Sequence, residues 1–181
     1  MASAAQVLRS VIFSPRSFYR GLATEGPVKE AVIFVLLVGT VAAALSATVT
    51  LLSGLIFGQV TPSILGYTLL QALLWAGLAP VVVGIIAAVY LLSIRTFVGQ
   101  VGNLKEVYKI AAYAYGVMIL AWIPGVYAVA ITYMLMILMG FGVREVYRTT
   151  FLTTVVIVLV GFVPCAIGFI LLRLAAAQPF G

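Results

Sequence analysis

The sequence predicts an all-α membrane protein: a polytopic bundle of five transmembrane helices, N-in and C-out, with an N-terminal amphipathic helix at the interface. Three observations predict this fold. Hydrophobic residues make up 65% of the 181 residues and charged residues only 8%, whereas soluble domains average roughly 25% charged. Several apolar runs are long enough to cross a bilayer. Nearly all the cations lie in the segments before the first, third and fifth of these runs, which would share one side of the membrane, as the positive-inside rule expects.

Residues 1–29 are predicted to form a cytoplasmic amphipathic arm. One helical face carries apolar side chains, at Val7, Leu8, Val11 and Ile12. Ser14 and Pro15 are typical of an N-cap and a first helical residue. The residues expected at the interface are Arg9, Arg16, Phe18 and Arg20. Such a basic stretch can lie in the plane of an anionic leaflet or pack as a cap on the inner end of the bundle, and the sequence favours neither.

A single membrane domain is predicted over residues 30–175, followed by a short tail at 176–181. A helix rises about 1.5 Å per residue, so crossing a hydrocarbon core of about 30 Å takes roughly 20 apolar residues. By this measure the spans are expected at about 31–57, 64–94, 107–123, 125–141 and 151–172.

Prolines divide or bend these runs. Residues 58–63 are expected to form a turn with Pro62 as the breaker. No polar turn flanks Pro80, which favours one kinked crossing over two half-helices, since a membrane helix tolerates proline. Pro124 and Gly125 lie between Trp122 and Tyr127, as in a hairpin that emerges from lipid, so two crossings are expected there.

The five-span count makes a prediction about charge. It places nine of the ten cations on the inner side and leaves Arg173 alone outside; the nine are Arg9, Arg16, Arg20, Lys29, Arg95, Lys105, Lys109, Arg144 and Arg148. Lysine and arginine in short loops determine orientation, so the pattern predicts N-in and C-out. If the 107–141 segment crossed only once, Arg144 and Arg148 would face outward.

A short charged motif recurs before three of the spans. It reads Lys-Glu at 29–30, Lys-Glu-Val-Tyr-Lys at 105–109 and Arg-Glu-Val-Tyr-Arg at 144–148. One interpretation is structural: each motif starts a helix, and its glutamate offsets the positive end of the helix dipole. Glu106 with Lys109, and Glu145 with Arg148, would also pair three residues apart on one helix face. The other is a single cytoplasmic patch for a protein partner or anionic headgroups, formed by Lys29, Glu30, Lys105, Glu106, Tyr108, Lys109, Arg144, Glu145, Tyr147 and Arg148.

The composition argues against catalysis. There is no histidine and no aspartate, so Ser-His-Asp, zinc and di-carboxylate sites are not expected, and no enzyme activity, cofactor, metal or nucleic-acid partner is predicted. Small residues at four-residue spacing predict close helix packing and leave a homo-oligomer open; they are Gly39, Ala43 and Ala47, then Ala76, Pro80, Gly84 and Ala88, then Ala112 and Gly116.

Several stretches resemble the Ypt-interacting-protein (Yip) family. They are Ser14 to Phe18, Lys105 to Tyr115, the break at 123–125, and Gly142 to Tyr147. The resemblance implies five membrane helices and a cytoplasmic N-terminus. Eukaryotic members bind Rab-type GTPases in vesicle traffic through a long N-terminal region. The short arm here looks like the compact prokaryotic branch, which implies a plasma-membrane or inner-membrane location and no settled activity.

Two functions follow as hypotheses. The first is a scaffold or accessory protein that binds a membrane-protein partner through its cytoplasmic face, with a trafficking-like or membrane-organising role. The second is a transporter or channel for a small or lipidic solute, suggested by possible helix breaks at Pro80, Pro124 and Pro164 and by Gln71 inside the second span.

Overall fold

The computed structural model describes residues 4–22 and 27–177, with side chains described up to residue 171. Two short helices come first, α1 (Ala4–Phe13) and α2 (Pro15–Arg20). Ser14 precedes Pro15, the first residue of α2, as predicted. Two long helices follow, α3 (Lys29–Ile56) and α4 (Pro62–Phe97). The predicted turn at 58–63 is therefore slightly misplaced, because Pro62 starts α4, with Thr61 as its N-cap.

The next segment changes helix type before it turns back. It consists of α5 (Leu104–Ala114) and a 3₁₀ helix, η1 (Tyr115–Leu120), and it ends in a turn where Gly125 has φ +82°. The return segment consists of α6 (Tyr127–Thr132), a π-helix η2 (Tyr133–Leu138) and α7 (Met139–Tyr147). Helix α8 (Phe151–Ala177) is last. The break predicted at Pro124-Gly125 is confirmed.

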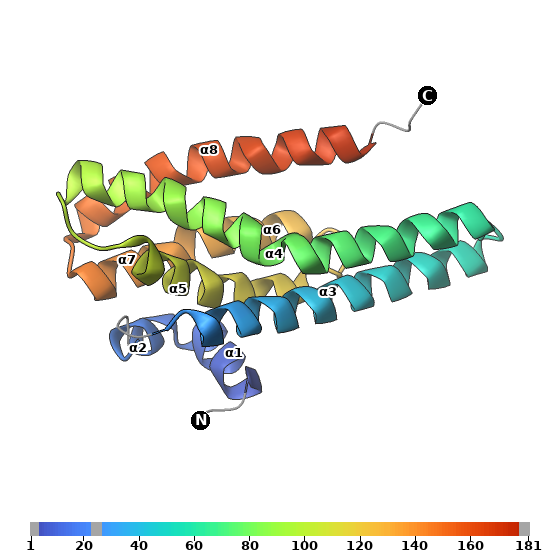
Figure 1. Cartoon of the computed structure of the whole chain (residues 1–181), viewed down its shortest axis with the longest axis horizontal. Coiled ribbons are helices and arrows are strands. Elements are labelled where there is room, and N and C mark those ends of the chain that lie inside the picture. Colours follow the sequence, from blue (N-terminus) through green and yellow to red (C-terminus); the bar gives the residue numbers. More distant parts are fainter. Residues whose placement is uncertain (1–3, 23–26, 178–181) are drawn as a thin grey trace.

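Among the described residues, four helices are long and apolar enough to cross a membrane: Lys29–Ile56, Pro62–Phe97, Tyr127–Tyr147 and Phe151–Leu171. The chain is thus an all-helical, multi-pass membrane protein. Figure 1 shows α3, α4, α5, α7 and α8 side by side, and the chain reverses direction from each long segment to the next. The hairpin of α3 and α4 extends beyond the turn between η1 and α6.

Pro80 lies inside α4, and the helix continues through it from Pro62 to Phe97. One continuous helix is therefore observed, as predicted, in place of two half-helices. Figure 1 shows that α4 changes direction along its length. Proline lacks the N–H that would bond the carbonyl four residues earlier, which is a common cause of such bends.

The core lies where α5, η2 and α7 meet α4. Its largest fully buried side chains include Tyr90, Ile110, Leu135, Leu138 and Met139. Small residues let the helices approach, as predicted: a Cβ on Gly39 would lie 3.1 Å from Cβ of Ala79, and one on Gly116 would lie 3.1 Å from Phe34. By contrast, large apolar side chains on α3, α4 and α8 point outward, as a lipid-facing surface requires.

The described backbone reaches Ala177 in α8, so the predicted tail at 176–181 lies mostly outside the described residues. The side chain of Arg173 also lies outside the described part.

Candidate functional site: a charged end of the bundle

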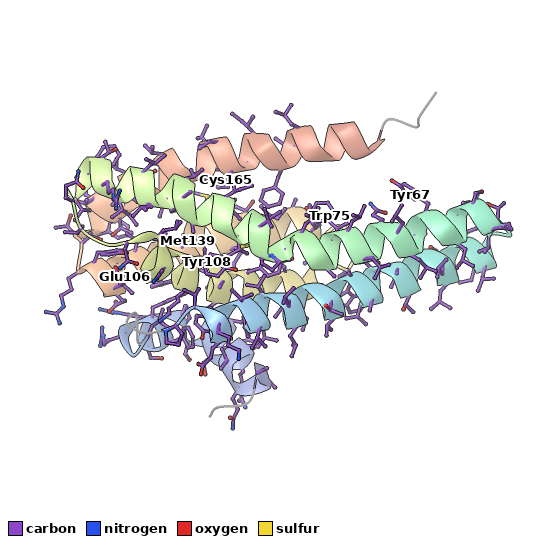
Figure 2. The ribbon with its side chains drawn as sticks, in the orientation of Figure 1. Tyr67, Trp75, Glu106, Tyr108, Met139 and Cys165 are labelled. Carbon is purple, nitrogen blue, oxygen red and sulfur yellow. The ribbon has the colours of Figure 1, made fainter. Side chains whose placement is uncertain are left out.

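Most of the charged side chains that the structure describes lie at one end of the bundle. Figure 1 shows α2, the starts of α3, α5 and α8, and the ends of α4 and α7 at that end. In Figure 2, Glu106 marks this end, whereas Tyr67 and Trp75 lie on the α3–α4 hairpin that extends the other way. The α3–α4 hairpin tip, from Phe57 to Ser63, carries no charged residue.

Glu145 on α7 holds the N-terminal arm. Its carboxylate accepts a hydrogen bond from Nε of Arg16 at 2.8 Å and another from Nε of Arg20 at 3.1 Å. The two arginine side chains are more than 60% exposed and the glutamate side chain is 10% exposed. Glu145 therefore joins α2 to α7. Its carboxylate pairs with Arg16 and Arg20 in place of the predicted partner, Arg148.

Buried contacts join the arm to the bundle. The hydroxyl of Tyr19 donates to the carbonyl oxygen of Ile110 at 3.3 Å, and Tyr133 donates to that of Ile12 at 3.2 Å. Val11 and Tyr19 are buried, and burial raises the pKa of Tyr19 well above its usual value, so it stays neutral. Phe18, expected at the interface, packs edge-on against Tyr113 with ring centroids 5.2 Å apart. The arm is thus packed on the bundle, one of the two arrangements that the sequence allowed.

Glu106 has a capping role. Its side chain accepts from the backbone of Asn103, the Asn103 side chain accepts from the Glu106 backbone, and together they form a capping box at the start of α5. The hydroxyl of Tyr147 also donates to Glu106, at 3.3 Å. The second and third motifs are therefore connected through this one hydrogen bond. An asparagine followed three residues later by glutamate is a capping-box signature, so this role of Asn103 could have been found in the sequence.

The other residues of the predicted patch differ in their exposure to solvent. Lys29 and Glu30 are exposed in the first turn of α3, Lys105 is exposed on α5, and Arg9 is exposed on α1. Lys109 was expected on the surface, but it is only 5% exposed and interacts within the chain. The reason is the helical period: it faces inward with the buried Val107 and Ile110. The hydroxyl of Tyr108 points to the carbonyl oxygen of Pro80, 3.5 Å away.

The motif at 144–148 does not start a helix, contrary to the structural interpretation above. It ends α7, and Arg148 is the C-cap in the left-handed conformation, with φ 51° and ψ 38°. α8 starts three residues later, at Phe151. The carboxylate of Glu145 therefore lies near the negative end of the α7 dipole, which disfavours its negative charge, and its ion pairs with Arg16 and Arg20 of α2 offset this.

We call the ion pairs of Glu145 with Arg16 and Arg20 the α2–α7 clamp. A pocket of about 360 Å³ opens beside it. Its lining consists of Arg16, Arg20, Arg144, Glu145, Arg148 and Thr149, and we call it the arginine pocket. The guanidinium of Arg144 lies over the ring of Phe151, 5.8 Å from the centroid. Thr149, in the connection between α7 and α8, also lines the pocket and was not among the predicted patch residues. An arginine-lined pocket can bind phosphate or carboxylate groups.

A second cavity, of about 670 Å³, lies between α3, α4, η1, α6 and α8. Both tryptophans of the chain line it, Trp75 and Trp122, together with Thr68, Gln71 and Tyr127. No Asp, Glu, Lys or Arg lines it. On α3, Thr48 donates to the carbonyl oxygen of Ala44 and Thr50 to that of Ser46, so both hydroxyls bond within their own helix.

No group of three or more potential metal ligands occurs in the part of the chain that the structure describes. Comparisons with curated proteins and with solved structures gave no match. The family model described as the Yip1 domain matches residues 9–173. This match runs from the arm into α8, and it includes the α2–α7 clamp and the four helices of the described residues that are long enough to cross a membrane. The chain therefore belongs to the Yip1 domain family of multi-pass membrane proteins.

Proposed function

We propose that the protein is a non-enzymatic scaffold or accessory protein that binds a membrane-protein partner through its charged end. The observation that carries the proposal is the concentration of exposed cations at one end of the bundle, where Glu145 holds α2 to α7. Protein partners often recognise such charged surfaces, because complementary charge selects and orients them.

The proposal includes five crossings, with the charged end in the cytoplasm. The segment from Leu104 to Leu120 would be the third crossing. Its α-helical part rises about 1.5 Å per residue and its 3₁₀ part about 2.0 Å, which gives a length of about 28 Å. That length is close to a hydrocarbon core of about 30 Å. Five crossings then place the cations of α2, α5 and α7 on one side, as the positive-inside rule expects.

Non-enzymatic function is supported by the chemistry available. The chain has no histidine and no aspartate. Two of its glutamates, Glu106 and Glu145, are engaged by a capping box and by two arginines. A general acid or base needs a free group placed against a substrate, and these carboxylates serve structural roles.

Photo-crosslinking in native membranes tests the partner. Glu106 and Glu145 are engaged within the chain, so the crosslinker is better placed at exposed neighbours, Lys29 and Lys105. Gln59, exposed at the far end of the α3–α4 hairpin, is the matched control. We expect Lys29 and Lys105 to capture one defined protein that Gln59 does not capture. Capture of lipid alone at all three positions would overturn the scaffold proposal.

A second candidate function is passage of a small or lipidic solute, and the cavity of about 670 Å³ favours it. Gln71, the buried Thr68, Ser46 and Thr50 supply polar groups in a lining that is otherwise made mostly of apolar and aromatic residues. Reconstituted vesicles would then show solute or lipid flux that Gln71→Leu abolishes and that Gln59→Leu leaves unchanged. Absence of flux across a broad panel of solutes would eliminate this candidate.

A further inference from the structure

The arginine pocket contains more positive charge than the protein compensates. Four guanidinium groups and one carboxylate line it, which leaves a net charge of +3 (four minus one). The one carboxylate, Glu145, already accepts from Arg16 and Arg20. Like charges gathered in a small volume repel one another, so a bound anion would stabilise the arrangement. Guanidinium groups match phosphate oxygens in number and geometry.

Arg148 occupies a backbone conformation that does not suit it. Its φ of 51° and ψ of 38° place it in the left-handed region at the end of α7. Glycine is the usual residue there, because a Cβ is disfavoured in that region. Arg148 is the one residue other than glycine with positive φ in the described ranges, 4–22 and 27–177. Unfavourable backbone conformations of this kind concentrate at functional sites. The side chain of Arg148, which has this conformation, lines the arginine pocket.

The surroundings of the pocket indicate a lipid. α8 starts next to it, and its first two residues, Phe151 and Leu152, are 68% and 73% exposed. Arg144 links the two environments, because its guanidinium lines the pocket and also lies over the Phe151 ring. Phosphate-binding cations directly next to outward-facing apolar side chains, at the end of a membrane-spanning helix, match the boundary between headgroups and acyl chains.

We propose that the arginine pocket binds the phosphate of an anionic glycerophospholipid, whose acyl chains run along Phe151 and Leu152. The bound phosphate lies between Arg16 and Arg20 of α2 and Arg144 and Arg148 of α7, so the lipid reinforces the junction that Glu145 makes. This inference rests on the proposed function only in placing the charged end at the membrane surface.

The test measures lipid binding by the full chain in neutral detergent, with native mass spectrometry as the readout. Dioleoylphosphatidylglycerol is the probe, and the zwitterionic dioleoylphosphatidylcholine is the comparison lipid. We expect the phosphatidylglycerol to bind about tenfold more tightly, and Arg144→Gln and Arg148→Gly each to weaken it about tenfold, as loss of a charged hydrogen bond implies. Arg95→Gln removes the same charge at the same end but outside the pocket, and we expect it to have little effect.

Arg148→Gly separates a binding role from a structural one. Glycine suits the left-handed conformation, so the melting temperature should not fall while phosphatidylglycerol affinity does. Affinity equal to that of the wild type in Arg148→Gly and Arg144→Gln would overturn the proposal. Competition by inorganic phosphate as effective as that by the lipid would overturn the lipid assignment in favour of a free anion. Because no protein partner is present, failure here leaves the crosslinking result unaffected.

Discussion

Individual residues hold the arm and the return segment in place. Glu145 joins α2 to α7 through two charged hydrogen bonds, and Tyr19 inserts beneath them to reach the carbonyl oxygen of Ile110. Gly142 makes this possible, because a Cβ there would collide with the side chain of Ile110 and lie 3.4 Å from the ring of Tyr19. The absence of a side chain at Gly142 thus brings α5, α7 and α2 together at one point.

We expect Gly142→Ala to destabilise the protein by about 1–3 kcal/mol, because the added Cβ would overlap Ile110, a fully buried side chain whose branched Cβ restricts its rotation. Thermal unfolding in detergent measures the change. The matched control is Gly140→Ala on the same helix, where the added Cβ would lie 3.5 Å from Val158, an ordinary contact. It should gain up to about 1 kcal/mol from helix propensity. Equal effects of the two substitutions would contradict the packing argument.

We expect Glu145→Gln to loosen α2 while leaving the helices of the membrane domain folded. The lost stability should be below about 1 kcal/mol, because both arginines are largely exposed and water screens the pairs. Hydrogen exchange of the α2 amides should increase, and exchange in α4 should not. Glu30→Gln, in the exposed first turn of α3, should leave α2 unchanged.

At the scale of elements, the return segment is the least regular part of the bundle. It passes through a π-helix, η2, where the carbonyl oxygen of Leu135 accepts a hydrogen bond from the Tyr90 hydroxyl of α4. A backbone carbonyl group within the membrane needs a hydrogen-bond donor. A π-helix replaces the usual hydrogen bonds between residues four apart with bonds between residues five apart. Gly161 of α8 packs against the same Tyr90 ring, at 3.0 Å for an added Cβ. One tyrosine therefore joins α4, η2 and α8.

Tyr90→Phe keeps the ring and removes the hydroxyl. We expect a loss of about 1–3 kcal/mol, since the Leu135 carbonyl oxygen would stay buried without this donor. Thermal unfolding in detergent gives the value, and Tyr67→Phe provides the control, because Tyr67 lies on the exposed side of α4 (54% exposed). An equally large loss of stability in Tyr67→Phe would contradict the argument that the bond from Tyr90 to the Leu135 carbonyl oxygen of η2 is responsible.

At the scale of the whole molecule, the segments differ greatly in length. α4 has 36 residues and α3 has 28, so they measure about 54 Å and 42 Å, well above the core thickness of about 30 Å. The segment from Leu104 to Leu120 barely reaches that thickness. The hairpin of α3 and α4 must therefore tilt or extend past the bilayer on the side away from the charges.

Single cysteines in a Cys165→Ala background test the orientation. We expect a membrane-impermeant maleimide to label cysteine at Gln59 and Pro124 in intact cells, because both lie in turns at the uncharged end. Cysteine at Lys105 and Thr150 should react only after permeabilisation. Labelling of Thr150 but not Pro124 in intact cells would mean that the 104–147 segment does not cross twice, and the five-span topology would then be wrong.

The sequence by itself determined the all-helical class, the breaks at Pro124-Gly125 and after α3, the continuity of α4 through Pro80, and the family. These properties are local, because in lipid each helix must satisfy its own backbone hydrogen bonds and its length must match the core. The positions of the cations along the chain were also visible without a structure.

Only the tertiary structure decided what the charged residues do. Glu145 bonds arginines 125 and 129 residues away, Lys109 is buried, and Arg148 takes a left-handed conformation at the end of α7. Three similar motifs thus came to do three different things, since a side chain's partner depends on which helix packs beside it. That packing is decided by contacts such as Gly142 on Ile110, which local sequence does not reveal.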